Sequence, residues 1–565
     1  MVLNIRFFLI FTTFFIGVLL HAQSWCDSSR SAIKERAYDI IAVLSHDSLK
    51  GREAGTYQDS VAAAFIADIF RETGLYTVLE NHTYKQPFKF INGIKVTKNN
   101  SFSLNDIKLD YETDFWPLNM SANKKTEGPL IHVGYGIEVP QHNYNDYADL
   151  SHSESAVFVI KTGMPDVLKD KDLPPYYSDL DFKISTAIGH GASGIIFIKS
   201  EDGDDEVPEL FNWHYRQAVD VPVIYADGRA AEMIKSKTSW HAKIAVELET
   251  EVRTSYNVIG YLDNDATSTI VIGGHYDHLG TGSPISRHRG APAIHPGADD
   301  NASGVAATIE LARLLVCQGY MKHNVLFIAF GAEEKGLLGS HYFVNSEAYD
   351  LTKINFMLNM DMVGRLDNDT RKLHIIGTGS SPVWDSIIDI TPADHFHVNK
   401  SASASGGSDH INFYLKDLPV LFFFTGIHED YHKPADVIDK INFDGFYYII
   451  KYVNTFISNV DTLILPFSQA PLDQARGQRR SATVALGIMP DHAYSGKGLK
   501  VADVVSDGPA ENAGIMRNDI IVKMDTHKVR DIYEYMHALN KLEQGQKIKV
   551  IIMRNDQQLS IDVLL

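Results

Sequence analysis

Residues 268–280 read STIVIGGHYDHLG, an apolar run that is followed at once by histidines and an aspartate. Similar apolar runs recur as NVLFIAFG (324–331), INFMLNM (354–360), KLHIIG (372–377) and VLFFFTG (420–426). Helical apolar spacing occupies residues 302–317 and 443–457. The alternation predicts an α/β fold with a central, mostly parallel or mixed sheet covered by helices on both faces.

Polar side chains gather where these predicted strands end. In such sheets the loops at the carboxyl ends of the strands carry the chemistry. One segment alone is weak evidence, because an aspartate often caps a helix and a lone histidine is usually an ordinary polar group. Five such segments in order predict one shared site: GGHYDHLG (273–280), PGADDNASG (296–304), GAEEKGLLGS (331–340), LNMDMVG (358–364) and DYHKPADVID (430–439).

The residue types match a hydrolytic site with two metal ions. Two imidazoles and three carboxylates, one of them bridging, would hold two divalent cations about 3.5 Å apart and leave room for a shared water. A fourth carboxylate must stay free to accept a proton from that water. The neighbours Glu333 and Glu334 offer this division, one as ligand and one as base. The alternative for this pair is a solvated helix start.

The rest of the chain divides into further segments. Helical spacing on both sides of GREAGT (51–56) predicts two helices, and residues 77–125 read as short strands. Residues 126–252 read as a β-rich insert, in which no His, Cys or carboxylate cluster has ligand spacing. A lid or interaction domain is therefore favoured for the insert over a second active site. Residues 466–480 read as a linker, and residues 481–565 as a separate C-terminal domain.

The N-terminus has the pattern of an export signal. Arg6 precedes the apolar run Phe7–Leu20, and the small-residue site at residues 20–22 predicts cleavage near Gln23. The run is shorter than the roughly 20 residues of a spanning helix, which disfavours the alternative of an uncleaved membrane anchor. We therefore expect an exported chain, which is secreted, periplasmic or at the cell surface.

Cys26 and Cys317 are the only cysteines. Export would permit a disulfide between them. Cys317, however, ends an apolar helix pattern, which favours a buried thiol.

Composition excludes several classes of protein. The 565 residues include 44% hydrophobic and 22% charged ones, which is typical of folded rather than disordered proteins. Lys and Arg number 52 against 71 Asp and Glu, a net charge of −19. This charge would repel nucleic acid and anionic lipid, so neither is an expected partner.

The five polar segments and their order resemble the M28 family of zinc aminopeptidases over roughly residues 35–125 and 253–462. The resemblance implies a discontinuous zinc-peptidase domain at residues 23–125 and 253–465. The insert resembles a protease-associated (PA) domain, and residues 481–565 resemble a PDZ domain.

The resemblance also implies roles for individual residues. Asp299 would bridge two Zn²⁺ ions and be followed by a cis peptide, and Glu333 would be the general base. Asp277 would fix the ring of His275, and Asp436 would orient His432. The implied metal ligands are His275, Asp299, Glu334, Asp361 and His432.

Further residues lie near these segments in the sequence. GGSDHINF (406–413) resembles the family loop that lines the substrate pocket, and makes Asp409 and His410 supporting or pocket groups; the alternative is a polar turn. Asn301 and Ser303 are given only a capping role. His278, His288 and His295 are interpreted as surface histidines.

In the PDZ-like domain, the glycine-containing turn before a strand would offer N–H groups to the terminal carboxylate of a peptide ligand. Here that turn would be Gly496, Gly498 and Leu499, which departs from the commonest Gly-Leu-Gly-Phe form. The alternative is a purely structural appendage.

The leading hypothesis is thus a secreted two-zinc exopeptidase that acts on peptide or protein substrates. The alternatives are a single-zinc glutaminyl cyclase and a non-catalytic receptor-like relative. The motifs alone do not separate aminopeptidase from carboxypeptidase action.

Overall fold

The structure is a computed structural model that describes residues 26–565 with gaps, so the predicted signal at residues 1–22 and the cleavage near Gln23 lie outside the described residues. None of the described helices is both long and apolar enough to cross a membrane. The gaps are residues 151–154, 172, 174, 201–217, 237–238, 284, 320, 405–406, 471–485, 491–493, 495, 505–507, 526, 531–534, 536–537, 540–541, 543–544 and 556.

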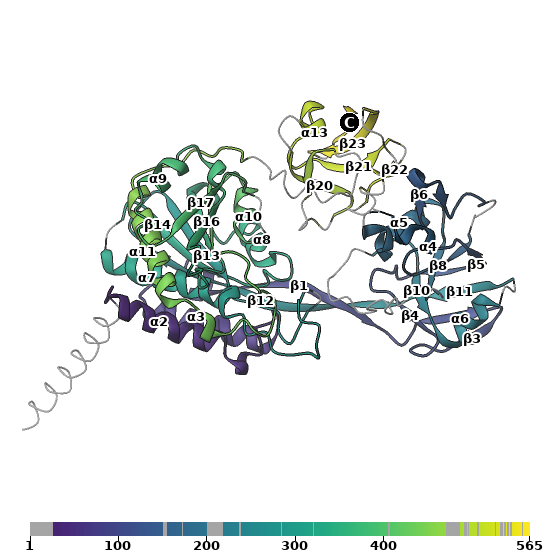
Figure 1. The fold of residues 1–565 in the computed structure, drawn as a ribbon, viewed down its shortest axis with the longest axis horizontal. Coiled ribbons are helices and arrows are strands. Elements are labelled where there is room, and N and C mark those ends of the chain that lie inside the picture. The colour runs from purple at the N-terminus through teal and green to yellow at the C-terminus, as the bar shows by residue number, and fades with distance from the viewer. Residues whose placement is uncertain are drawn as a thin grey trace, which may run out of the picture. The chain divides into compact units, whose positions relative to one another are not determined.

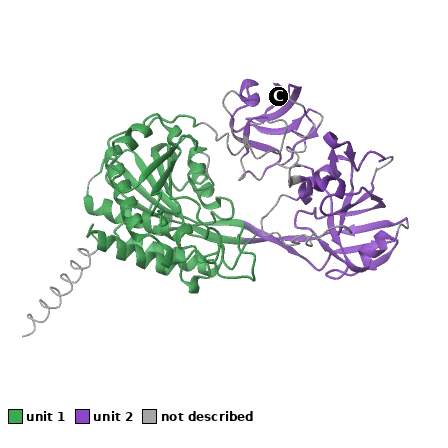
Figure 2. Cartoon of the chain, viewed as in Figure 1, with its two compact units in different colours: residues 1–90, 253–471 green, residues 91–252, 472–565 purple. Residues whose placement is uncertain are grey.

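The chain divides into two compact units (Figure 2). Unit 1 comprises Met1–Phe90 and Arg253–Pro471, and unit 2 comprises Ile91–Val252 and Leu472–Leu565. Two strands, β1 (Lys85–Val96) and β12 (Leu248–Leu262), continue along the chain across this division.

Unit 1 is built on an eight-stranded sheet with the order β1-β12-β14-β13-β15-β18-β16-β17 (Figure 1). Neighbours among β14, β13, β15 and β18 are parallel, whereas β12 and β16 run antiparallel to β14 and β18. The sheet is mixed with a parallel centre, as predicted. Its other strands are β13 (Thr269–His275), β14 (Asn324–Phe330), β15 (Ile354–Met360), β16 (Lys372–Ile376), β17 (His397–Ser401) and β18 (Val420–Phe424).

Helices cover both faces of this sheet, because its central strands are apolar on both sides. Residues of β14 alternate: Phe327 and Ala329 enter one core, whereas Leu326 and Ile328 enter another. The first core includes residues of α2 (Arg30–Leu44), α3 (Tyr57–Glu72), α7 (Gly304–Gln318), α9 (Trp384–Ile390) and α11 (Phe443–Val460). The second includes residues of α8 (Leu338–Asn345) and α10 (His410–Tyr414).

The segment GREAGT separates α2 from α3, as predicted. Thr56 caps α3, because its hydroxyl accepts the backbone N–H of Asp59. Arg52 has a positive φ of 48°, and its side chain is fully buried. The turn between the two helices therefore points the side chain of Arg52 into the interior of unit 1.

Cys26 and Cys317 form a disulfide. The interpretation of Cys317 as a buried free thiol was therefore wrong. Apolar spacing correctly predicted a helix around Cys317. Apolar spacing does not show, however, that α2 packs against α7. This packing brings Cys26 to the last turn of α7.

We expect Cys317→Ser to lower the free energy of unfolding by about 2–4 kcal/mol, because the bridge restricts the unfolded chain. The two cysteines are separated by 291 positions, so the loop that the bridge closes is long. Urea unfolding with and without dithiothreitol measures the effect. The reductant should destabilise the parent and leave Cys317→Ser unchanged; a parent that does not respond would contradict the expectation.

Unit 2 contains a second eight-stranded sheet with the order β3-β2-β11-β5-β8-β9-β10-β4. Its strands β2, β3 and β4 come from residues 101–117, so the predicted insert boundary at residue 126 is corrected to about residue 91. Short strands at 77–125 were predicted, but sequence spacing did not show which sheet they join. The strands are β2 (Ser101–Leu104), β3 (Ile107–Leu109), β4 (Phe115–Pro117), β5 (Lys125–His132), β8 (Val157–Lys161), β9 (Gly194–Ile198), β10 (Val223–Ala226) and β11 (His241–Ala245), with helices α5 (Leu180–Gly189) and α6 (Gly228–Lys235).

The C-terminal residues form a small sheet of their own around a separate apolar core. Its strand order is β19-β20-β21-β23-β24, with β22 paired to β21. The elements are β19 (Ile488–Pro490), β20 (Leu499–Val504), α13 (Pro509–Asn512), β21 (Ile520–Met524), β22 (His527–Lys528), β23 (Lys547–Arg554) and β24 (Gln557–Leu564).

The predicted linker at residues 466–480 begins too early. Phe467 and Ala470 pack into a core of unit 1, and the Tyr414 hydroxyl accepts the backbone N–H of Ala470 at 3.0 Å. Residues 471–480 lie outside the described residues. Lack of apolar periodicity marked this stretch as a loop, and only packing shows that its first residues are anchored.

Truncation after Pro471 should therefore leave unit 1 stable, whereas truncation after Leu465 should cost about 2–4 kcal/mol, because Phe467 and Ala470 lose their contacts. Thermal unfolding of the two truncated chains, each compared with the full chain, measures the difference. Equal transition temperatures for both truncations would show that the anchoring contributes nothing.

Candidate metal centre

The ends of three neighbouring parallel strands bring the predicted ligands together. His275 is the last residue of β13, and Asp361 directly follows β15. Glu333 and Glu334 lie in the turn after β14. Because β13 pairs with both β14 and β15 in parallel, these chain positions meet at one edge of the sheet.

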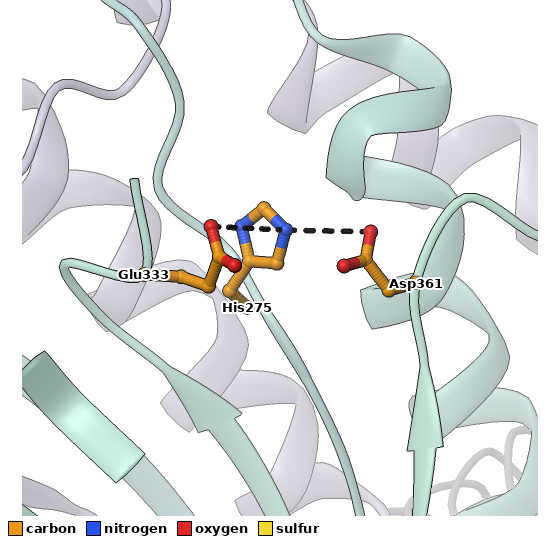
Figure 3. A group of neighbouring side chains, drawn as sticks. All are labelled: His275, Glu333 and Asp361. Atoms are coloured by element: carbon orange, nitrogen blue, oxygen red, sulfur yellow. Dashed lines mark ion pairs between the residues drawn. The ribbon is translucent and has the colours of Figure 1, made fainter. Parts of the chain in front are cut away.

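A first group of side chains surrounds Nε2 of His275 (Figure 3). Oδ1 of Asp361 lies 3.4 Å from this nitrogen, and Oε2 of Glu333 lies 3.8 Å from it. Oδ1 of Asp300 also lies 3.4 Å away. Ligands about 2.0–2.2 Å from a shared tetrahedral ion are about 3.3–3.6 Å apart, so Asp361 and Asp300 fit co-ligands of His275 better than Glu333 does.

A second group surrounds Nε2 of His432. This nitrogen lies 3.3 Å from Oδ2 of Asp300 and 3.4 Å from Oε2 of Glu334. His278 is also close, but its Nδ1 is 2.7 Å from Oε1 of Glu334, which is a hydrogen-bond distance. His278 therefore supports Glu334, and His432 fits the ligand position that the family resemblance implied for it.

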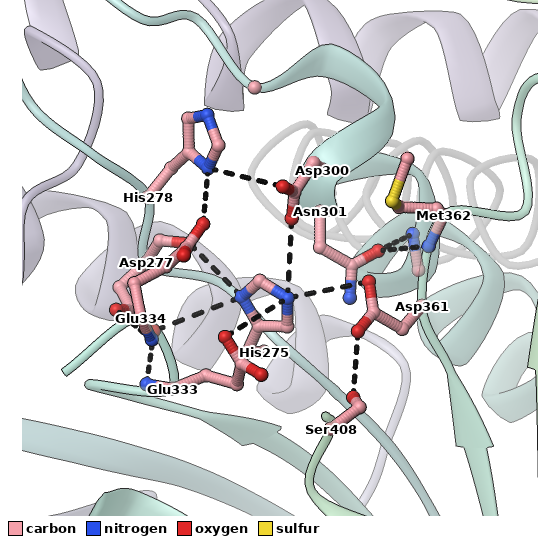
Figure 4. Close-up of polar contacts among 12 residues, drawn as sticks. His275, Asp277, His278, Asp300, Asn301, Glu333, Glu334, Asp361, Met362 and Ser408 are labelled. Atoms are coloured by element: carbon pink, nitrogen blue, oxygen red, sulfur yellow. Dashed lines mark hydrogen bonds and ion pairs between the residues drawn. The ribbon is translucent and has the colours of Figure 1, made fainter. Parts of the chain in front are cut away.

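Asp300 joins the two groups, with Oδ1 facing His275 and Oδ2 facing His432 (Figure 4 draws Asp300 beside His275). The assignment of the bridge to Asp299 is thus corrected to its neighbour. Asp299 Oδ1 instead accepts the Ser303 hydroxyl and the backbone N–H of Gly364. The cis peptide also follows Asp300, not Asp299. Two adjacent aspartates in GADDN look equivalent until the backbone direction is known.

Asn301 and Ser303 have more than the capping role that the sequence suggested. The Asn301 amide donates to Met360 O, and its oxygen accepts the backbone N–H groups of Met362 and Gly304 (Figure 4). The Ser303 hydroxyl oxygen accepts the N–H of Val363. The loop that carries Asp300 is therefore tied to the loop that carries Asp361.

The residues present fit a pair of divalent cations. Asp300 Oδ2 and Asp361 Oδ1 are buried and have no hydrogen-bond partner among the described residues. These are two of the oxygens that the ligand geometry directs at the ions. An unpaired buried carboxylate oxygen is costly, so a cation at these positions would remove a real penalty.

Each ligand histidine presents Nε2 to the centre and is oriented through Nδ1. The Nδ1–H of His275 donates to the backbone oxygen of Asp277 at 3.1 Å, and that of His432 donates to Ile285 O at 3.1 Å. This is the common arrangement for metal-binding histidines. The expectation that the carboxylate of Asp436 orients His432 was wrong, since a backbone carbonyl does so.

The carboxylates of Asp277 and Asp436 instead accept hydrogen bonds from backbone N–H groups. Asp277 accepts the N–H groups of Glu333 and Glu334 at 2.9 and 3.3 Å. Its Oδ1 is 3.9 Å from Nδ1 of His275, so its predicted bond to that ring is corrected to its own backbone oxygen. Asp436 accepts the N–H groups of Asp299 and Asp300 at 3.0–3.1 Å. Each of these aspartates fixes the dipeptide that carries a ligand.

Burial among like charges raises the pKa of several carboxyl groups. Burial is the main cause in each case, and it raises the pKa of Asp277 to about 8, of Asp409 to about 7 and of Asp436 to about 6. Without cations the centre would therefore hold protons at neutral pH. Binding of cations would release them, which makes metal affinity fall as the pH falls.

The adjacent glutamates differ in their environments. Burial and the charges of Glu334 and Asp361 outweigh the opposing effect of His275 and raise the pKa of Glu333 well above its usual range. Burial also disfavours the charge of Glu334, but hydrogen bonds from His278 and His432 outweigh it and lower its pKa well below the usual range. Environments that separate two carboxyl groups in this way suit one proton acceptor and one anionic ligand.

Arg52 is a fully buried cation beside the centre, and no sequence pattern predicted this role. Its guanidinium donates to the backbone oxygens of Tyr276, Pro296 and Gly297 at 2.7, 2.6 and 3.0 Å, and to that of Leu44. Burial lowers its pKa only to about 10, because nearby aspartates oppose the shift. Arg52 therefore stays charged at neutral pH and links the segments that carry His275 and Asp300.

Residues 407–413 support the centre from the side of Asp361. The Ser408 hydroxyl, missed in the sequence, donates to Asp361 Oδ2 at 2.7 Å (Figure 4). Asp409 accepts the Ser340 hydroxyl. His410 donates to Ala404 O, and burial lowers its pKa to about 3, so this ring is neutral.

The three additional histidines differ in exposure. His278 and His295 are buried, so their interpretation as surface residues was wrong, whereas His288 is exposed. The side chain of His295 is hydrogen-bonded to Ser286, whose hydroxyl oxygen lies 2.7 Å from its Nε2. No periodicity marks loop residues 281–296, so the sequence could not show which side of this loop faces inward.

In the C-terminal domain, the turn that was predicted to bind a peptide carboxylate precedes a strand that is paired on both sides. The N–H of Gly498 donates to Arg530 O at 3.0 Å, and Leu499 is buried. Leu499 begins β20, which is paired on both sides, by β19 and β21. Among the described strands of this sheet, β19 and β24 lie at the two edges, and Gly487 just before β19 has a positive φ of 76°. The turn of Gly496, Gly498 and Leu499 is therefore a poor candidate for the peptide site.

Comparisons with known proteins give matches to both the peptidase part and the C-terminal part of the chain. The profile of Peptidase family M28 matches residues 257–457, and the PDZ domain profile matches residues 484–565. Aminopeptidase YwaD of Bacillus subtilis is 33% identical over 424 residues, which are 72% of this chain and 80% of that protein.

Other relatives match over a shorter length. A probable leucine aminopeptidase 2 of Aspergillus fumigatus is 30% identical over 36% of this chain and 39% of that protein. An aminopeptidase of Pseudomonas aeruginosa is 28% identical over 46% of this chain and 52% of that protein. The chain thus spans about half or less of the length of these two. A solved zinc aminopeptidase of Bacillus subtilis is 23% identical with a TM-score of 0.47, over 77% of this chain and 95% of that one.

We expect Asp300→Asn to lose both cations, because Asp300 is the residue that both groups share. Asp299→Asn is the matched control: it keeps Oδ1 as an acceptor for Ser303 and Gly364, and should keep both cations. Elemental analysis after dialysis measures the content. Cations retained by Asp300→Asn and lost by Asp299→Asn would restore the original assignment of the bridge.

Proposed function

Since the chain belongs to peptidase family M28 and is a zinc aminopeptidase with a C-terminal PDZ domain, we propose that it holds two Zn²⁺ ions per chain and removes N-terminal residues from peptides, with Glu333 as general base. The observation that carries the proposal is the position of Asp300 between the two ligand groups. A carboxylate with one oxygen directed at each group suits a pair of ions.

The chain would supply three ligands to each ion. His275, Asp361 and Oδ1 of Asp300 would hold one, and His432, Glu334 and Oδ2 of Asp300 the other. Bound zinc lowers the pKa of water toward neutrality and polarises a carbonyl oxygen.

Glu333 fits the general base by position and by environment. Its carboxylate reaches to 3.8 Å from the ligand nitrogen of His275 but is farther away than the co-ligands. Its raised pKa suits a group that accepts a proton from the attacking water and then gives it to the departing amine. Asp277 accepts the backbone N–H of Glu333, which fixes the backbone that carries the base.

The carboxylate-rich surroundings of His275 also suit a substrate's free amino group. Glu333, Asp361 and Asp409 are buried there, and the ammonium of an N-terminal residue would pair with them. An internal peptide bond brings no such charge. This difference favours removal of single N-terminal residues.

The two alternatives are less well supported. A single-zinc glutaminyl cyclase needs only one ligand group, whereas this chain has two with a shared carboxylate. A receptor-like relative has no need of a buried Glu333 that lies farther from His275 than the two proposed co-ligands do. Two zinc ions per purified chain would favour the peptidase over the cyclase.

We propose further that the chain is exported. The N-terminal pattern and the Cys26–Cys317 bridge support this, because disulfides persist mainly in oxidising compartments. N-terminal sequencing of the chain recovered outside the cytoplasm should give a start near Gln23.

Glu333→Gln should keep two zinc ions and peptide binding, while kcat falls about 10²–10⁴-fold, because the amide cannot accept the proton. Steady-state hydrolysis of aminoacyl anilides, with elemental analysis, measures both. Exposed Glu347→Gln, which lies on the same unit, is the control and should match the parent. A Glu333→Gln rate within about threefold of the parent would exclude Glu333 as the base, since loss of a general base costs far more.

A further inference from the structure

The loop of residues 281–296 lies against His432 and is fixed there by its backbone. The N–H of Arg287 donates to His432 O at 2.9 Å, and Ile285 O accepts the Nδ1–H of the His432 ring at 3.1 Å. Ser286 adds a hydroxyl 3.4 Å from His432 O. The backbone of Arg287 is therefore held next to a ligand of the centre.

The side chain of Arg287 is exposed and lies over a ring at the edge of the site. Its guanidinium carbon is 4.7 Å from the centroid of Tyr431, and the Tyr431 ring stacks on the His432 ring with centroids 3.8 Å apart. Within the described part of the chain, no carboxylate forms an ion pair with this guanidinium. The cation–π contact positions the group and leaves its N–H donors available.

Charge is distributed unevenly along the centre. Glu333, Asp361 and Asp409 lie at the His275 end, where they favour the ammonium of the substrate. At the other end, around His432, the loop of residues 281–296 adds the cationic guanidinium of Arg287. A peptide whose amino group pairs with the acidic end would extend its following residue toward Arg287.

We propose that Arg287 is a specificity residue, which binds a carboxylate on the substrate residue that follows the scissile bond. This inference rests on the proposed aminopeptidase function. A guanidinium presents two parallel N–H donors that match a carboxylate. The carboxylate can be the C-terminus of a dipeptide or an acidic side chain, and both would meet the same group.

The two sources are separated by matched substrates. With the best N-terminal residue X, X-Gly is compared with X-Gly-amide, and X-Asp-amide with X-Asn-amide. In the parent we expect kcat/KM to favour the carboxylate of at least one pair by about tenfold or more, as for a charge-assisted hydrogen bond, and mainly through KM.

Arg287→Gln should reduce this ratio to within about twofold of one, and Arg287→Lys should restore part of it, because a single charge remains. Exposed Arg289→Gln is the matched control, two residues along the same loop, and should keep the parent ratio. Zinc content and thermal unfolding of each variant identify any loss of the fold. The ratio is internal to each variant, so a change in the absolute rate does not affect it.

A parent ratio near one for both pairs, or a ratio that Arg287→Gln leaves unchanged, would overturn the proposal and assign Arg287 only to packing on Tyr431. In either case, hydrolysis of X-anilide, which carries no carboxylate, still reports the aminopeptidase activity. Failure of the specificity proposal is thus distinct from failure of the proposed function.

Discussion

The burial of many carboxylates in one place is the constraint on which the centre of unit 1 depends. Charges of one sign that are removed from water must be matched by cations, hydrogen-bond donors or protons. Here all three occur: Arg52 and the histidines, backbone N–H groups held by Asp277 and Asp436, and raised pKa values. The buried carboxylates are Asp277, Asp299, Asp300, Glu333, Glu334, Asp361, Asp409 and Asp436.

This constraint explains why the supporting residues bind backbone rather than one another. Asp277 and Asp436 each accept two consecutive N–H groups, so each carboxylate is satisfied and also fixes the neighbouring ligand. Among the residues that the structure describes, Arg52 donates only to backbone oxygens, which places its charge beside the centre without neutralising a ligand. The ligand carboxylates are thereby left for cations.

Much of the fold and site could be predicted from patterns. Apolar runs gave the central strands, and β15 was predicted to the residue. Polar residues at strand ends gave the segments that carry His275, Glu334 and Asp361, because parallel strands bring their ends to one edge, and the resemblance to the M28 family implied their roles as ligands. The bridge was misplaced by one residue, because both aspartates of GADDN precede the same helix, and only their backbone directions distinguish Asp300. Loop 281–296 and the turn at Arg52 show no apolar periodicity, so the sequence could not predict which of their side chains face inward.

The sequence by itself determined the central sheet, its helices and the chemical types that meet at its edge, since periodicity and strand order are local properties of the chain. Tertiary structure alone decided which aspartate bridges, which carbonyls orient the histidines, that Cys26 reaches Cys317, and that Arg52 and His278 are buried. These features depend on contacts between segments far apart in the chain. Their geometry is set by packing, which no local pattern records.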